Sequence, residues 1–190
     1  FRVRASRMGD VWHSGPIYVG KPNISWLRRI EGGTPYTEYQ RIHEGRTGMV
    51  YVGSNGGMLH GFDAATGVEK MAYLPAALFS TAISKGYHAL TDPDYNHSSL
   101  YVDETPFLAD ARIINRAIDP INAQWRTVLV GGLGRGGRGV YALDVTVPDE
   151  LADKSKASQT VLWEFNSDDD ANLGYTHSKP FVAYLNNGKW

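Results

Sequence analysis

The chain has 190 residues, which is the size of one domain, and a hydrophobic content of 42% is ample for a core. With 19 basic and 20 acidic residues the net charge is −1, so we expect no electrostatic binding of nucleic acid or of an anionic membrane. No stretch approaches the roughly 20 apolar residues of a membrane span, and the lack of cysteine excludes disulfides, thiol catalysis and cysteine-based zinc sites.

The first part of the chain predicts one unit of four antiparallel strands. A strand over 13–19 (HSGPIYV) is followed by an insertion over 21–46 that is rich in Tyr, Glu and Arg. Two strands, 50–53 and 58–63, flank SNGG, whose Asn-Gly and Gly-Gly steps supply the positive φ angles of a tight hairpin. The turn DAATG comes next, where Asp63 or Thr66 can accept hydrogen bonds from turn amides. EKMAYLP then predicts the outer strand, which ends at Pro75.

A second unit follows a long insertion over 74–101, in which the first part of PAALFSTAISKGYHAL predicts a short helix. DETPFLADA (103–111) predicts its first strand, and another insertion covers 115–125. RTVLVGGLGRGGRGVYALDVTVPDE then gives two strands around glycines, and SQTVLWEF (158–165) predicts the outer strand. Gly53 aligns with Gly131 at an offset of 78 residues, and Asp63 aligns with Asp144 at an offset of 81.

Repeated units of four antiparallel strands are typical of a β-propeller. The sequence therefore predicts an all-β fold with blade A over 11–75, blade B over 103–166 and the first strand of another blade over 177–190, where HSKPFVAYL opens like the two earlier units. Two blades and a strand cannot close a ring, so we expect the chain to be part of a larger propeller. A twisted sheet or a sandwich is the alternative.

Five motifs in order, across nearly the whole chain, resemble the C-terminal propeller of PilY1-type proteins: GDVWHSGPIYVG, RTGMVYVGSNGGMLHGFDAATG, LTDPDYNHSSLYVDETPFLADA, TVLVGGLGRGGRGVYALDVT and LWEFNSDDDANLGYTHSKPFVAYLNNGKW. These proteins are type IV pilus biogenesis factors and pilus-tip adhesins, related to the neisserial PilC adhesins. The resemblance implies a modified seven-bladed, quinoprotein-like propeller. It also implies export through the periplasm and presentation at pilus tips, at the outer membrane or as a secreted protein.

The resemblance further implies a role in pilus extension, adhesion and surface sensing, with minor pilins and host or abiotic surfaces as partners. Proteins of this family hold calcium in an acidic, EF-hand-like loop of the propeller. By the order of the family's motifs, that loop lies downstream of the final NNGKW. Calcium is therefore expected in the full-length protein, and no ligand of that loop is carried over to this chain.

Two other functions are open. HGFDAATGVEKM resembles the repeat of pyrroloquinoline quinone (PQQ) dehydrogenases, in which the turn is a packing device rather than the catalytic site. Many of those enzymes also use a vicinal disulfide, which a chain without cysteine cannot form. We therefore expect a quinoprotein-like blade without quinone and no catalytic residue, with a PQQ dehydrogenase or a structural propeller module of another secreted protein as the alternatives.

Two acidic loops are candidate metal sites. In DPDYNHSSLYVD, oxygen-bearing residues fall at positions 1, 3, 5, 7 and 12 of an EF-hand loop. His97, however, stands where that loop needs glycine, so a solvated loop is favoured. In NSDDDANLG (166–174) three adjacent carboxylates cannot all face one ion, and an exposed turn is favoured. The candidate ligands are Asp92, Asp94, Asn96, Asp103, Asp168 and Asp170.

Two surfaces are candidate partner contacts. GGLGRGGRG contains a Gly-x-Gly-x-x-Gly match, but a strand follows it, whereas a phosphate-binding loop must lead into a helix. We therefore expect a hairpin with Arg135 and Arg138 exposed at its tip. The insertion over 26–39 carries the aromatic and arginine residues that favour interfaces, namely Trp26, Arg28, Tyr36 and Tyr39.

Overall fold

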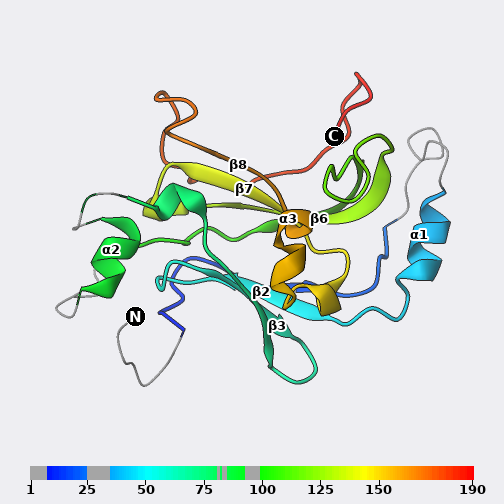
Figure 1. The fold of residues 1–190 in the computed structure, drawn as a ribbon, viewed down its shortest axis with the longest axis horizontal. Helices are drawn as coiled ribbons and strands as arrows, with labels where there is room; N and C mark the ends of the chain where they lie inside the picture. The colour runs from blue at the N-terminus through cyan, green and yellow to red at the C-terminus, as the bar shows by residue number, and fades with distance from the viewer. Residues whose placement is uncertain (1–7, 25–34, 81, 83–84, 93–98) are drawn as a thin grey trace.

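The computed structural model describes residues 8–24, 35–80, 82, 85–92 and 99–190. In this part of the chain, two four-stranded antiparallel sheets hold their strands in sequence order (Figure 1). Blade A contains β1 (Ile17–Val19), β2 (Met49–Gly53), β3 (Leu59–Asp63) and β4 (Glu69–Tyr73). Blade B contains β5 (Phe107–Ile113), β6 (Gln124–Gly132), β7 (Gly139–Asp144) and β8 (Val161–Asn166). Both predicted units of four strands are present.

Short helices occupy the connections between strands. They are α1 (Tyr36–Ile42) between β1 and β2, η2 (Ala76–Leu78) and α2 (Gly86–Thr91) between the blades, η3 (Gly134–Gly136) at the β6–β7 hairpin, and η4 (Pro148–Glu150), η5 (Lys154–Lys156) and α3 (Ala157–Thr160) before β8. The helical turn predicted early in the 74–101 insertion is η2. The outer strand of blade B begins at Val161 rather than at Ser158, because Asp153 caps η5 through the Ser155 amide and the helical turns continue to Thr160.

The pairing of strands corrects the predicted alignment of the two blades by one residue. Gly53 pairs with Leu59 in blade A, and the matching pair in blade B is Gly132 with Val140. The offsets between blades are therefore 79 residues for the second strand and 81 for the third, because the hairpin of blade B is two residues longer. Offsets of 78 and 81 would put one strand's side chains on the wrong face of the sheet, since neighbouring side chains alternate.

The DAATG turn between β3 and β4 has the predicted geometry. Asp63 Oδ1 accepts hydrogen bonds from the amides of Ala65 and Thr66 at 2.9 and 3.0 Å, and Thr66 Oγ1 accepts from the Val68 amide at 3.3 Å. Gly67 has a φ of 72°, which favours glycine over any residue with a side chain. The turn therefore fixes the corner of the blade, as expected of a packing device.

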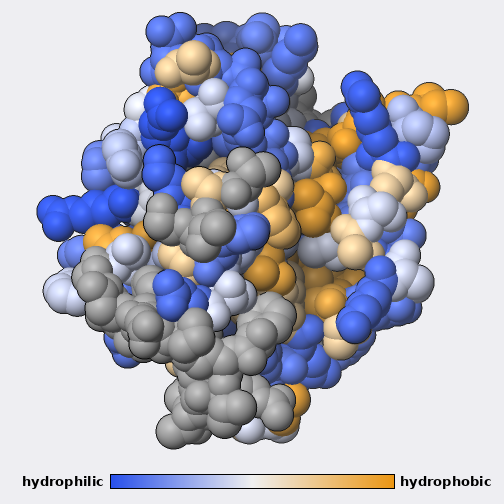
Figure 2. Space-filling model, turned by 60° about the vertical axis from the view of Figure 1, so that its left-hand side comes forward, coloured by the Kyte–Doolittle hydropathy of each residue, from blue (hydrophilic) through white to orange (hydrophobic). Residues whose placement is uncertain are grey.

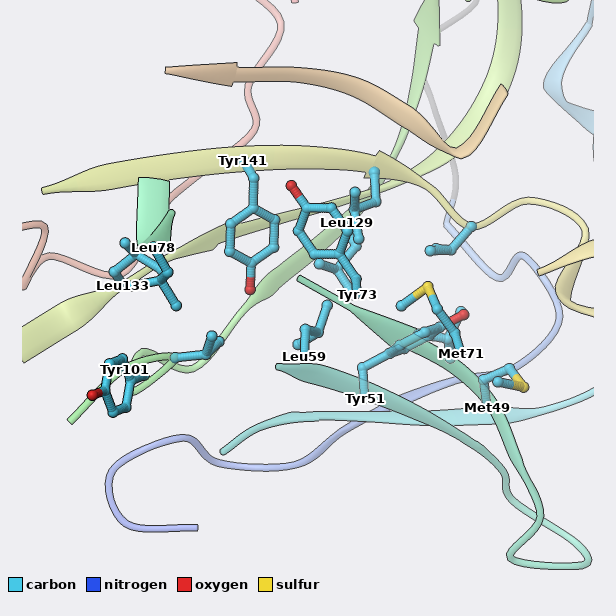
Figure 3. Close-up of a cluster of buried hydrophobic side chains, with 14 of the residues drawn as sticks. Met49, Tyr51, Leu59, Met71, Tyr73, Leu78, Tyr101, Leu129, Leu133 and Tyr141 are labelled. Atoms are coloured by element: carbon cyan, nitrogen blue, oxygen red, sulfur yellow. The ribbon is translucent and has the colours of Figure 1, made fainter. Parts of the chain in front are cut away.

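The main hydrophobic core lies between the two blades (Figure 3). Blade A contributes Val19, Met49, Tyr51, Leu59, Met71 and Tyr73, and the facing side of blade B contributes Leu129, Tyr141 and Leu143. Leu78, Leu90, Tyr101, Val102, Leu133 and Val145 from the connections complete the cluster. The blades are thus packed face to face as neighbours. Burial of this apolar area, at about 25 cal/mol per Å², is the main term that holds them together.

A smaller apolar cluster lies on the opposite face of blade B and contains Ala111, Val128, Val130 and Ala142. Figure 2 shows one side of the molecule as largely hydrophilic, with hydrophobic atoms gathered in a hollow. Residues 177–190, predicted to start another blade, lie near this cluster and form no strand. The prediction of another blade there stays a prediction.

Candidate functional site

The first candidate metal loop does not come together as a site in the described residues. Asp94 and Asn96 lie outside them. The Asp103 carboxylate is buried, with one oxygen 2.7 Å from Nδ1 of His13 and the other accepting a hydrogen bond from the His13 amide at 3.3 Å. His13 precedes β1, so Asp103 joins the inner ends of the two blades. Its role in this structure is an interblade contact, and a metal at Asp92 stays a prediction.

The second candidate metal loop is an exposed turn after β8. Asp169 Oδ2 accepts from the Asn166 amide at 2.9 Å, and Asp170 Oδ1 accepts from the Asn172 amide at 2.9 Å. The part of the chain that the structure describes holds no group of three or more His, Asp or Glu side chains placed around one point. Cation binding by Asp168 and Asp170 therefore stays a prediction.

The tyrosines predicted as exposed partner contacts are buried, and the prediction is wrong for these two side chains. Tyr36 and Tyr39 are 2% and 4% exposed, because helix α1 turns this face toward β5 and β6 of blade B. The Tyr36 ring meets Trp125 edge to face with centroids 4.9 Å apart. Residues three apart share a helix face, so both tyrosines pack inward together. Trp26 and Arg28 lie outside the described residues.

The hydroxyl groups of Tyr36 and Tyr39 are hydrogen-bonded within a buried polar network. Tyr36 donates to Asp110, and Tyr39 Oη lies 2.6 Å from Thr127 Oγ1. Thr127 donates to the other oxygen of Asp110 at 2.5 Å and accepts from Nη1 of Arg46 at 2.6 Å. Burial, and after it Asp110, raises the pKa of both phenols, so both remain protonated donors. The network ties the β1–β2 insertion of blade A to the strands of blade B.

A second set of contacts joins β8 and the connection before it to blade A. Glu164 on β8 accepts from the hydroxyl of Tyr73 and from the Ala76 amide, the latter at 2.7 Å. Asp149 accepts from Thr47 Oγ1 at 3.1 Å and from Lys70 Nζ at 3.2 Å. The two blades are thus joined near their first strands by Asp103 and His13, in the middle by the hydrophobic core, and at their outer strands by Glu164 and Tyr73. The pair therefore forms a rigid support for the connecting loops.

Three residues of blade A are hydrogen-bonded in the order of a Ser-His-acid triad. Nε2 of His60 lies 3.0 Å from Ser54 Oγ, and Nδ1 lies 2.5 Å from Glu69 Oε1. A nucleophile must reach a substrate, however, and Ser54 is only 1% exposed. Ser54 directly follows β2, His60 lies in β3 and Glu69 lies in β4, so the chain of hydrogen bonds links neighbouring strands of the sheet.

The tip of the β6–β7 hairpin projects Arg135 and Arg138 into solvent, as the sequence predicts. The hairpin is held against the connection between the blades, since a Cβ on Gly136 would lie 1.8 Å from the carbonyl oxygen of Tyr101. The two exposed charges therefore sit on a fixed backbone. Of the residues predicted to contact a partner, they are the two that the structure places in solvent.

Sequence reasoning missed Asp110, Thr127 and Glu164, which make the interblade contacts. One signal was available for Asp110, because a carboxylate within the apolar strand FLADARI must find partners when it is buried. Thr127 and Glu164 carry no such signal, since their partners come from blade A, 81 to 91 positions away.

Comparison with known proteins decides the family. The PilY1 beta-propeller domain family matches residues 8–190. The chain belongs to the PilY1 β-propeller family. A type IV pilus biogenesis factor PilY1 of Pseudomonas aeruginosa (strain UCBPP-PA14) is 41% identical over 194 residues, and a PilY1 homologue of Xylella fastidiosa (strain Temecula1) is 39% identical over 191 residues. Both alignments cover 100% of the chain.

The PilY1 fold is supported by a solved structure. The crystal structure of the Pseudomonas aeruginosa PilY1 C-terminal domain superposes with a TM-score of 0.65 and 36% sequence identity, over 91% of this chain and 30% of that one. The chain spans only 14 to 15% of the two curated PilY1 relatives. It is therefore one β-propeller segment of the PilY1 type, and the predicted fold class is confirmed.

Proposed function

We propose that this chain is a non-catalytic propeller segment of a type IV pilus biogenesis factor, acting in pilus assembly and as part of a tip adhesin. The observation that carries the proposal is the family match over residues 8–190, together with about 40% identity to PilY1 over the whole chain. The proposed site of action is the bacterial surface at the pilus tip, reached through the periplasm. Among the described residues, no helix is long and apolar enough to cross a membrane.

The proposed mechanism is binding by loops on a rigid support. Blades A and B are fixed to each other by the interblade core, and their connections carry the exposed side chains. The proposed partners are minor pilins and host or abiotic surfaces, which would couple the propeller to pilus extension, adhesion and surface sensing. Calcium, where the full-length protein binds it, is assigned downstream of this chain.

Replacing Arg135 and Arg138 together with glutamate in the full-length protein tests the proposed contact. We expect binding to the minor pilins of the same bacterium to weaken about tenfold, or about 1.4 kcal/mol, because both charges are exposed and their reversal opposes an acidic partner. Binding is measured with purified proteins, and pili on the cell surface are counted in parallel.

The matched control reverses the exposed Arg116 and Lys154, which lie in the β5–β6 and β7–β8 connections and carry the same total charge. It should bind and support pili like the wild type. Equal weakening by both pairs would point to net charge rather than to the hairpin tip. Dye reduction with alcohols that requires added PQQ would contradict the non-catalytic proposal.

A further inference from the structure

A pocket of about 350 Å³ lies between the first strands of the two blades. One wall is the end of β1 with the segment after it, residues 18–24, and the other wall is the stretch of β5 from Leu108 to Asp110. Arg46, which lies shortly before β2, also lines the pocket. The volume is near the lower end of the range of roughly 300–1,000 Å³ that is typical of ligand pockets, so we expect a small ligand.

Most of the lining is apolar. The apolar residues are Val19, Pro22, Ile24, Leu108 and Ala109, together with the ring of Tyr18. Tyr18 is 67% exposed, and a Cβ on Gly20 would lie 2.7 Å from its hydroxyl oxygen. The phenol ring therefore lies over the Gly20 backbone and gives the pocket an exposed aromatic surface at its rim. Such walls favour a ligand that has a hydrocarbon part.

Arg46 brings a fixed positive charge with spare donors to this pocket. Its Nε donates to the carbonyl oxygen of Gly20 at 2.6 Å, and its Nη1 donates to Thr127 Oγ1 at 2.6 Å. These two hydrogen bonds hold the guanidinium in one orientation. A guanidinium has five N–H donors, so among the described residues three of them, including both on Nη2, are left for a ligand.

The other charges of the lining favour an anion. Asp110 is 4% exposed, and its two oxygens already accept hydrogen bonds from Tyr36 and Thr127. Lys21 adds a second positive charge, and its pairing with Glu44 is loose, because the N–O distance is 4.0 Å and both side chains are largely exposed. Two cationic groups thus face one carboxylate whose oxygens are already hydrogen-bonded.

We propose that this pocket binds a carboxylate carried on a short aliphatic chain, as in the side chain of glutamate or in a short-chain fatty acid. The planar carboxylate accepts from the spare N–H groups of Arg46, whose fork matches its two oxygens. The methylene groups pack against Leu108 and the Tyr18 ring. A sugar acid fits less well, because its hydroxyl groups would lose their hydrogen bonds to water against the apolar walls.

Saturation-transfer NMR with the full-length protein tests the proposal, because it detects weak ligands of a large protein through the ligand signals. The probes are the acetylated, amidated tripeptide Ala-Glu-Ala, its glutamine analogue Ala-Gln-Ala, and butanoate. We expect the glutamate methylene protons to receive more saturation than the alanine methyl groups. The glutamine analogue should bind about tenfold more weakly, because it lacks the charge that Arg46 recognises.

Variants of the lining locate the binding. Arg46→Gln should weaken binding of Ala-Glu-Ala about tenfold, and Tyr18→Ser should weaken it about threefold by removing the aromatic surface at the rim. The matched control is Arg41→Gln on α1, whose side chain is 70% exposed and does not line the pocket. It should bind the peptide like the wild type.

Equal binding of the glutamate and glutamine peptides would overturn the proposal, and so would unchanged binding by Arg46→Gln or no binding of any carboxylate probe. If Arg46→Gln does not fold, since it also loses the bond to Thr127, then Lys21→Gln and Tyr18→Ser decide, and full affinity in both contradicts the site.

The probes also distinguish the source of the carboxylate. Binding of the glutamate peptide without butanoate supports an acidic side chain of a protein partner as the ligand, and binding of butanoate alone supports a free acid. Binding of both supports a site for the shared group. The readout does not depend on pilus assembly, so this proposal and the proposed function can fail separately.

Discussion

Replacing Asp110 with alanine is expected to lower the free energy of unfolding of the propeller domain by about 3 kcal/mol. Asp110 is buried and accepts hydrogen bonds from Tyr36 and Thr127, and Thr127 in turn accepts from Arg46. Alanine leaves the buried hydroxyl donors of Tyr36 and Thr127 without their acceptor. Equilibrium denaturation, followed by tryptophan fluorescence, measures the change.

The matched control is Asp149→Ala, which removes another carboxylate that bridges the blades. Asp149 is largely exposed, with 63% of its side chain accessible, so its contacts with Thr47 and Lys70 are screened by water. Its loss should cost less than about 1 kcal/mol. Equal costs for the two variants would mean that the buried network contributes nothing beyond an ordinary surface contact.

Replacing Gly136 with alanine is expected to destabilise the domain by about 3 kcal/mol, because the new Cβ would lie 1.8 Å from the backbone oxygen of Tyr101. That oxygen belongs to the connection between the blades, so relief of the clash requires the hairpin and the connection to separate. Thermal unfolding compared with the wild type measures the loss.

Gly174→Ala serves as the control, since nothing lies within 4 Å of its added Cβ and its φ is not positive. A change within about 0.5 kcal/mol is expected there. If Gly136→Ala were equally mild, the close approach of the hairpin to Tyr101 would not be a feature of the folded protein.

Local sequence signals predicted the strands well because turns and strands are short-range features. The glycines of SNGG and the Asp63 side chain determine where the chain reverses, and the apolar runs beside them become β2, β3 and β4. The alignment of the two blades could not be predicted from these local signals. The pairing of Gly132 with Val140 shows that the hairpin of blade B is longer, which moves the alignment by one residue.

The surface was harder to predict because exposure depends on packing between segments far apart in sequence. Tyrosine is a residue type that is common in protein interfaces, which is why Tyr36 was predicted to contact a partner. In the structure Tyr36 instead packs against blade B of the same chain. The spacing of Asp103 fits the last position of an EF-hand loop. In the structure, however, its carboxylate contacts His13, which lies 90 positions earlier in the sequence. The exposure of Arg135 was predicted correctly, because a charged side chain at the tip of a hairpin usually points into solvent, while its contact with a partner stays a prediction.

The most direct test of the central claim, that this two-blade segment serves pilus biogenesis as a packed support, is a count of surface pili on bacteria lacking their own copy of the gene. The cells are supplied with the full-length protein carrying either Gly136→Ala or Gly174→Ala, at matched protein levels. The account predicts few or no pili with Gly136→Ala and normal numbers with Gly174→Ala. Normal piliation by a Gly136→Ala protein whose blades have come apart would contradict it.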